Sequence, residues 1–277
     1  MTKGESDMGP WDKHFAPREA ARQLARVFGS DGEEAEGGRS VRVREILFVE
    51  LLGGLGDVLI SLAATQALAR SHPEARLTVL TFPPGGELLR GDPLISEVVQ
   101  APKPDHDHPR RAREAVEELL AREGWDLVVS DTSYDGIDDL IRGSGVPRVV
   151  TNLWRSPPPD ERVGERFLRI LLAQGLIEPK VIAPPRLHLT PEERSVAATQ
   201  LAGAGRPLAY LLPDAGMDVK RWPEESWGGL GRALVDRYDA EVVVPVGFDP
   251  EQASRVVRLV GKRARVWPRG TLRELAA

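Results

Sequence analysis

The sequence predicts an α/β protein made of two doubly wound domains with parallel sheets, the second of them incomplete. The chain has 277 residues, which is long for one compact core, and 41% of them are hydrophobic. Short apolar runs alternate with amphipathic segments, which is typical of parallel strands and the helices that cover them. A proline-rich passage near residues 178–190 interrupts this rhythm, and we place the domain boundary there.

Residues 1–43 are predicted to form an N-terminal appendage, in which an amphipathic segment leads into an acidic, glycine-containing linker. The first domain is expected over residues 44–187. Its apolar runs predict strands at 44–51, 75–82, 96–102, 125–131 and 145–152, and its amphipathic segments predict helices at 58–71, 86–91, 109–124 and 161–176.

The second domain is expected over residues 188–277. Strands are predicted at 207–215, 240–247 and 264–268, with helices at 191–205, 224–238 and 250–261 and the start of another at 271–277. A strand, helix and strand together take roughly 30 residues. About 90 residues therefore hold only half of a doubly wound domain.

Composition excludes several classes of protein. The sequence has no cysteine, which excludes disulfides and thiolate metal sites, and its five histidines are scattered. A net charge of −5 argues against a nucleic-acid partner. The N-terminus lacks the apolar core of a signal peptide, and no run approaches the ~20 apolar residues that span a bilayer. We expect a cytoplasmic protein, either free or peripheral to a membrane, and the oligomeric state stays open.

A glycine-rich turn at residues 50–59, ELLGGLGDVL, joins the first strand to the first helix and places Asp57 in the first helical turn. It is not a P-loop, and the dinucleotide pattern G-x-G-x-x-G fails at Leu59. A helix N-terminus stabilises a carboxylate there, whereas that carboxylate would repel a phosphate. Asp57 is therefore predicted to be a charged acid facing a cleft, or else only a cap for the helix.

A second polar stretch, LPDAGMDVKRWPEESW at residues 212–227, follows a buried strand of the second domain. It sets Lys220 and Arg221 in a loop just before a helix. Adjacent cations beside free helix amides suit the charge that develops on a diphosphate leaving group. The alternative is a solvated basic pair next to a packed Trp222.

These two stretches together resemble glycosyltransferase family 9, the ADP-heptose lipopolysaccharide heptosyltransferases. Residues 46–99 resemble the family's opening, in which a strand and a small-residue turn ending L-G-D lead into a helix. Residues 211–234 resemble its second signature, P-G-A followed by K-R-W-P and a helix. WDLVVSD and ERFLRILLAQGL match between them in order and spacing, so that the resemblance covers residues 44–277.

The resemblance implies a GT-B fold of two Rossmann-like domains, with the acceptor bound mainly by the first and the nucleotide sugar mainly by the second. It implies an inverting, metal-independent enzyme that moves a heptose or similar sugar from an ADP-sugar to a saccharide, glycolipid or natural-product hydroxyl. No cofactor is implied beyond that donor. Asp57 falls on the family's proposed general base, and Lys220 on the lysine that binds the donor phosphates.

Further site residues are expected around these two positions. The donor set is Lys220, Arg221, Ala215, Gly216 and Trp222, and the acceptor set is Gly53, Gly54, Gly56, Asp131 and Tyr134. Asp131 and Tyr134 enter because they follow a strand end, and a polar helix-capping loop is the alternative for them. For Trp222, packing is favoured over contact with a sugar. No metal site is expected, because the D-x-D at 105–107 is better explained by capping and solvation.

The sequence departs from the family at four places. Gly53 and Gly54 stand where serines are common in the turn. Glu50 stands where a basic residue is usual, and Asp214 replaces the glycine that follows the proline of the second motif. The D-[ST]-G-P loop of the donor site is absent, so we expect a C-terminally shortened chain, either a fragment or a naturally short protein. The alternative function is a degenerate, non-catalytic GT-B chain that acts as a sugar-binding or partner subunit. A nucleotide-sugar epimerase is a further alternative.

Overall fold

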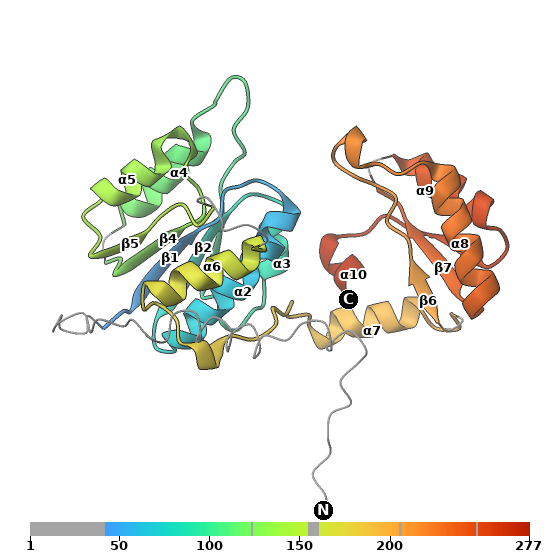
Figure 1. Cartoon of the computed structure of the whole chain (residues 1–277), viewed down its shortest axis with the longest axis horizontal. Helices are drawn as coiled ribbons and strands as arrows, with labels where there is room; N and C mark the ends of the chain where they lie inside the picture. The colour runs from blue at the N-terminus through green and yellow to red at the C-terminus, as the bar shows by residue number, and fades with distance from the viewer. Residues whose placement is uncertain (1–41, 123, 155–160, 205–206, 248) are drawn as a thin grey trace, which may run out of the picture. The chain divides into compact units, whose positions relative to one another are not determined.

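The chain divides into two compact units, residues 1–188 and 189–277. The computed structural model describes residues 42–277 except 123, 155–160, 205–206 and 248. The predicted amphipathic segment and nearly all of the appendage, residues 1–41, lie outside the described residues. Each unit contains a parallel sheet with helices packed on it, so the α/β prediction is confirmed (Figure 1).

The first unit is built on a five-stranded sheet. Its strands are β1 (Glu45–Val49), β2 (Arg76–Thr81), β3 (Glu97–Gln100), β4 (Leu127–Ser130) and β5 (Arg148–Val150). They pair in parallel in the order β3-β2-β1-β4-β5, which is the strand order of a doubly wound fold. Because β1 is central, its apolar residues are buried on both faces of the sheet, as its uninterrupted apolar run predicts.

Helices cover both faces of this sheet. The helices are α2 (Leu55–Ser71), α3 (Gly85–Leu89), α4 (Arg111–Leu120), α5 (Ile137–Gly143) and α6 (Val163–Ala173), with short 3-10 turns η1 (Tyr134–Gly136) and η2 (Pro179–Val181). Ile46 and Phe48 of β1 pack toward α2 and α6, whereas Leu47 and Val49 pack toward α4 and α5. Figure 1 shows these two helix pairs on opposite sides of the sheet.

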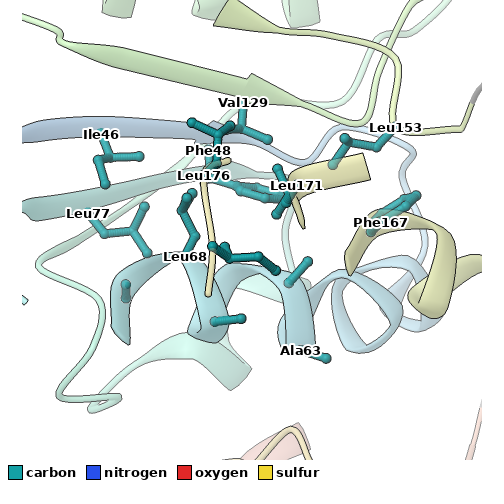
Figure 2. Close-up of a cluster of buried hydrophobic side chains, with 14 of the residues drawn as sticks. Ile46, Phe48, Ala63, Leu68, Leu77, Val129, Leu153, Phe167, Leu171 and Leu176 are labelled. Carbon is teal, nitrogen blue, oxygen red and sulfur yellow. The ribbon is translucent and has the colours of Figure 1, made fainter. Parts of the chain in front are cut away.

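The larger core cluster lies between the sheet, α2 and α6. Phe48, Leu68, Phe167 and Leu171 are fully buried there, and Figure 2 shows Leu68 of α2 among them. This cluster fixes α2 on the sheet along most of its length. The N-terminal turn of α2 is thereby held at the edge where β1 ends.

Helix α5 is missing from the sequence prediction, which treats the segment between the fourth and fifth strands as a polar loop. It is only seven residues long and carries two aspartates in its first turn. Ile137, Leu140 and Ile141 nonetheless have helical spacing, and Ile137 and Ile141 are fully buried. That spacing was the available signal.

The second unit has a three-stranded parallel sheet in the order β6-β7-β8. Its elements are α7 (Pro191–Gln200), β6 (Leu208–Tyr210), η3 (Asp218–Lys220), α8 (Glu224–Tyr238), β7 (Glu241–Pro245), α9 (Pro250–Val260), β8 (Ala264–Trp267) and α10 (Leu272–Ala276). A Cβ on Gly228 would lie 2.4 Å from Leu259 Cβ, and one on Gly231 would lie 2.4 Å from Val260 Cγ2. These two glycines of α8 allow its close packing on α9.

No helix of the described part of the chain is both long enough and apolar enough to cross a membrane.

Two leucines of α2 give a matched test of this packing. Leu68 is 0% exposed, whereas Leu59 is 41% exposed on the same helix. Leu68→Ala is expected to lower the free energy of unfolding by roughly 3 kcal/mol, because it removes buried methyl groups and leaves a cavity. Leu59→Ala is expected to cost less than about 1 kcal/mol. Urea denaturation measures both, and equal losses would contradict the packing described.

Candidate functional site

Three strands of the first unit end together at the edge of the sheet that precedes α2. Val49 of β1 is in register with Leu80 of β2 and with Ser130 of β4. The ladder continues by one residue, because Glu50 N–H donates to Leu80 O at 2.8 Å and Asp131 N–H donates to Val49 O at 3.1 Å. The polar residues at the next register position therefore lie side by side at this edge.

The turn after β1 presents Asp57 at the start of α2. Gly53 adopts a φ of +103°, which a glycine accommodates without strain. Gly54 N–H donates to Asp57 Oδ2 at 2.8 Å, so the capping interaction considered for Asp57 is present. Asp57 Oδ1 forms no hydrogen bond with the described residues. The partly exposed carboxylate thus has one oxygen engaged by the helix N-terminus and one available to a ligand.

Glu50 lies directly behind this turn and is only 2% exposed. Thr81 Oγ1 donates to Glu50 Oε2, while Oε1 is buried without a hydrogen-bond partner. Burial raises the pKa of Glu50 to about 7, and the charge of Asp57 adds to this effect, against the opposing hydrogen bond from Thr81. The sequence analysis did not predict this burial, because it treats Glu50 as a departure from the family pattern at the end of the predicted strand 44–51.

Asp131 is buried beside Glu50 and is 1% exposed. Its Oδ1 accepts hydrogen bonds from Thr132 Oγ1 at 2.7 Å and from Leu51 N–H at 3.3 Å, and its Oδ2 has no partner. Burial, followed by the negative charge of Glu50, raises the pKa of Asp131 well above its ordinary value. The side chain faces the turn and not the solvent, so it supports the site from behind.

Two more side chains hold the turn. Tyr134 Oη donates to Leu51 O at 2.8 Å, and Lys103 Nζ donates to Gly53 O at 3.0 Å. Burial and the nearby carboxylates raise the pKa of Tyr134 to about 12, so its hydroxyl remains a donor at neutral pH. Lys103 comes from the loop after β3, and the sequence prediction missed it because nothing in that loop's pattern links it to the turn.

The residues that the sequence predicts to bind the acceptor differ in their exposure to solvent. Gly54 and Gly56 are exposed, and a Cβ on Gly56 would meet nothing within 4 Å, which leaves room over the turn. Tyr134 is 40% exposed. The structure brings these residues to one edge with Asp57, whereas Asp131 is shielded.

The donor loop of the second unit lies between β6 and α8. Arg221 Nη1 pairs with Asp218 at 2.9 Å, and Arg221 Nε donates to Ala215 O at 3.1 Å. Lys220 is exposed and forms no ion pair within the described part of the chain. Its ammonium group is consequently available to an anion, whereas the guanidinium of Arg221 shapes the loop.

Two features oppose or limit a phosphate at this loop. Asp214 packs over Gly247 after β7, where a Cβ would lie 1.9 Å from Asp214 Oδ2. Trp222 is 49% exposed and packs edge-on against Trp227, with ring centroids 5.4 Å apart, so part of its surface serves packing. Gly216 is exposed with open space around it. The loop is therefore small and open at Gly216 but carries an acid at Asp214.

The D-x-D at residues 105–107 lies in a turn before α4, and it does not cap that helix, whose N-cap is Arg110. Asp105 accepts hydrogen bonds from the backbone N–H groups of Asp107 and His108 and from Arg111. The hydrogen bond from His108 contributes most to lowering the pKa of Asp105. Among the residues that the structure describes, no group of three or more His, Cys, Asp or Glu side chains is arranged to hold a metal ion.

Comparison with known proteins identifies what this chain is similar to. Residues 161–277 match the model of glycosyltransferase family 9 (heptosyltransferase). The chain is similar to a solved glycosyltransferase family 9 structure from Veillonella parvula, at 18% identity and a TM-score of 0.70, over 84% of this chain and 71% of that chain. A search of curated proteins by sequence found no match.

Two Escherichia coli structures are also similar. ADP-heptose LPS heptosyltransferase II matches at 17% identity and a TM-score of 0.59, over 83% of this chain and 75% of that chain. Heptosyltransferase WaaC with ADP-2-deoxy-2-fluoro heptose matches at 18% identity and a TM-score of 0.56, over 84% and 78%. At such identities these likenesses show the fold, and the predicted GT-B architecture is confirmed.

The buried Glu50 makes the stability of the first unit depend on pH. The folded chain holds a proton on Glu50 up to about pH 7, whereas the unfolded chain loses it near 4.5. Between these values the folded state binds more protons, so the free energy of unfolding falls as pH rises and then levels off. The free energy of unfolding falls by on the order of 3 kcal/mol, since a difference of one in pKa corresponds to about 1.4 kcal/mol. Glu50→Gln is expected to reduce this slope, and the buried Asp131 keeps a part of it.

Urea denaturation between about pH 5 and about pH 8 measures the effect. Glu97→Gln is the matched control, because Glu97 is an acid of the same sheet whose side chain is 40% exposed and pairs with Arg122. The control should keep the wild-type slope. A wild-type free energy of unfolding that does not change over this range would contradict the burial of Glu50.

Proposed function

We propose that this chain, which shares the GT-B fold and matches glycosyltransferase family 9 over residues 161–277, is an inverting, metal-independent glycosyltransferase. It would move a heptose or similar sugar from an ADP-sugar to a hydroxyl of a saccharide, a glycolipid or a natural product. The single observation that carries the proposal is the position and exposure of the Asp57 carboxylate. It is a partly exposed carboxylate at the N-terminus of α2 with one oxygen not engaged by the described residues.

Asp57 would act as the general base. The acceptor hydroxyl oxygen attacks the anomeric carbon of the donor sugar, and its proton passes to Asp57. A carbon–oxygen bond to the acceptor forms while the bond to the phosphate oxygen breaks, and ADP leaves with the bonding electrons. One displacement inverts the configuration at the anomeric carbon. A single carboxylate suffices for this chemistry, and the exposed Gly56 beside it, where a Cβ would meet nothing within 4 Å, leaves space for the acceptor.

Lys220 would bind the donor diphosphate. Its ammonium is exposed and not committed to an acid in the described residues, so it can stabilise the charge that develops on the leaving group. A fixed cation of this kind, with the first-turn amides of α8, takes the place that a metal ion has in other transferases. The proposal places the reaction in the cytoplasm because its donor is a nucleotide-activated sugar.

The similarity to known structures supports the class of donor. One of the similar Escherichia coli structures is described as heptosyltransferase WaaC with ADP-2-deoxy-2-fluoro heptose. The lipopolysaccharide acceptor named for the other, heptosyltransferase II, is one member of the acceptor class proposed here.

One observation favours the second candidate function, a non-catalytic sugar-binding or partner subunit. Asp214 puts a carboxylate in the turn of the second motif, close against Gly247. A negative charge there works against a diphosphate. Under this alternative Asp57 would only cap α2, and the chain would bind saccharide without releasing ADP.

Replacing Asp57 tests whether this chain is a glycosyltransferase that uses Asp57 as its general base. Asp57→Asn keeps an oxygen that can accept from Gly54 N–H but removes the group that takes the proton. Release of ADP from an ADP-heptose with a panel of acceptors is expected to slow by roughly 100-fold or more. Asp139→Asn is the control, because it makes the same charge change at an exposed first-turn position of α5.

The same assay separates the alternatives. Adding EDTA should leave the wild-type rate unchanged if no metal takes part. A rate for Asp57→Asn equal to that of the control would remove Asp57 from the mechanism. Absence of turnover by wild type, together with saccharide binding in calorimetry, would establish the non-catalytic candidate.

Binding of ADP tests the donor site. Lys220→Ala is expected to raise the Kd for ADP by roughly 10-fold, because a charge-assisted contact to phosphate contributes about 1.5 to 3 kcal/mol. Lys262→Ala removes an equally exposed lysine from the turn after α9 and should leave the Kd within about twofold. Calorimetry measures both constants. An unchanged Kd for Lys220→Ala would place the diphosphate elsewhere.

A further inference from the structure

The proposed reaction uses Asp57 and leaves two buried carboxyl groups behind it without a role. We propose that Glu50 and Asp131 are positioning residues that share a proton, and that the charge of this pair sets how strongly Asp57 takes the proton of the acceptor. The inference deepens the proposed function and rests on it for the role of Asp57. The sharing of a proton by Glu50 and Asp131 stands on geometry alone.

Strand register places the two carboxyl groups side by side. Glu50 and Asp131 occupy the position after the pair Val49 and Ser130 of neighbouring parallel strands. Such strands lie about 4.8 Å apart, and side chains at one register position point to the same face. Both groups continue the face that carries Phe48 and Val129, which α2 and α6 cover. The two carboxyls are therefore neighbours in the protein interior, under the first turn of α2.

One oxygen of each carboxyl group lacks a hydrogen-bond partner, and a proton between the two groups would satisfy both oxygens. Glu50 Oε1 and Asp131 Oδ2 are both buried without a partner, while the other oxygen of each group accepts hydrogen bonds. Two ionised carboxylates so close and so well buried repel each other strongly, and one of them keeps a proton. The raised pKa values of both groups agree with this, with burial as the largest cause.

The groups that face the pair come from several neighbouring elements. Thr81 at the end of β2 donates to Glu50, and Thr132 after β4 donates to Asp131. Tyr134 in η1 is neutral near pH 7. Asp57 at the start of α2 is the third carboxylate, and Lys103 after β3 is the cation that acts on Glu50. One cation facing three carboxyl groups favours keeping a proton within the set.

The pair acts on Asp57 by charge and through the turn. Asp131 Oδ1 accepts from Leu51 N–H, and the same turn continues to Gly54, whose N–H binds Asp57. Linkage between titrating groups is reciprocal. When the pair carries two negative charges, a proton on Asp57 is more stable, so Asp57 is a stronger base. When Asp57 takes the acceptor proton, its charge is lost and the pair releases its own proton to water more readily.

Infrared spectroscopy of the whole chain tests the shared proton without any assay of activity. The carbonyl stretch of a protonated carboxyl group is expected in wild type below neutral pH and should disappear as pH rises through about 7. Glu50→Gln should lack this transition, and Glu97→Gln should keep it. Thr81→Val should move it to higher pH, because Thr81 stabilises the ionised form. If Glu50→Gln does not fold, Asp131→Asn should move the transition to lower pH, because it removes the neighbouring carboxylate charge while Glu50 stays buried.

The kinetic arm tests the effect on Asp57. The wild-type kcat should rise by roughly 3- to 10-fold as pH passes through about 7, since a stronger base speeds proton transfer. Glu50→Gln should lose this rise and keep the KM for the donor within about twofold, and Glu97→Gln should behave as wild type. A Glu50→Gln profile that retains the rise would overturn the inference, as would an infrared transition unaffected by both Glu50→Gln and Asp131→Asn. If wild type shows the infrared transition but no turnover, the proposed function fails and the shared proton stands.

Discussion

The hydrogen-bonded ladder that fixes β1 between β2 and β4 is the constraint on which the site depends. Because β1 pairs on both sides, its carboxyl end cannot move without breaking the ladder to Leu80 or from Asp131. The turn that follows inherits this rigidity, and α2 begins six residues after Val49 with its length packed in the core. Asp57 at the first turn of α2 is thereby held by main-chain contacts as well as by the hydrogen bond that its carboxylate accepts from Gly54 N–H.

Burial then gives carboxyl groups at one edge two different environments. Asp57 is partly exposed, and its charge is stabilised by Gly54 N–H and by the helix N-terminus. Glu50 and Asp131 are buried beneath it, and their removal from water raises the pKa of each. Environments that separate the protonation of chemically similar groups are how a site obtains one group that accepts a proton and others that hold one. The hydroxyl of Tyr134 and the ammonium of Lys103 complete the turn as donors.

Local pattern was enough to predict β1, the glycine turn and the place of Asp57, because apolar runs and a helix start are properties of neighbouring residues. It was not enough for the pairing of Glu50 with Asp131. These residues are 81 positions apart and reach adjacent register positions only because β4 lies next to β1, an order that no local pattern specifies. Lys103 was missed for the same reason. Asp131 was placed at the correct edge, but its depth depends on how α2 and α6 cover the sheet.

In the second unit the residues of the motif are present, but their charges are already partly committed. Arg221 pairs with Asp218, and Arg255 neutralises Glu224 at the start of α8. Within the described loop this leaves Lys220 as the cation without an ion pair, in a turn that also holds Asp214. A diphosphate at this loop would therefore depend on one ammonium group more heavily than the motif K-R-W-P suggests. Under the proposed function, recognition of the donor and presentation of the base would rest on separate elements, each fixed within its own unit.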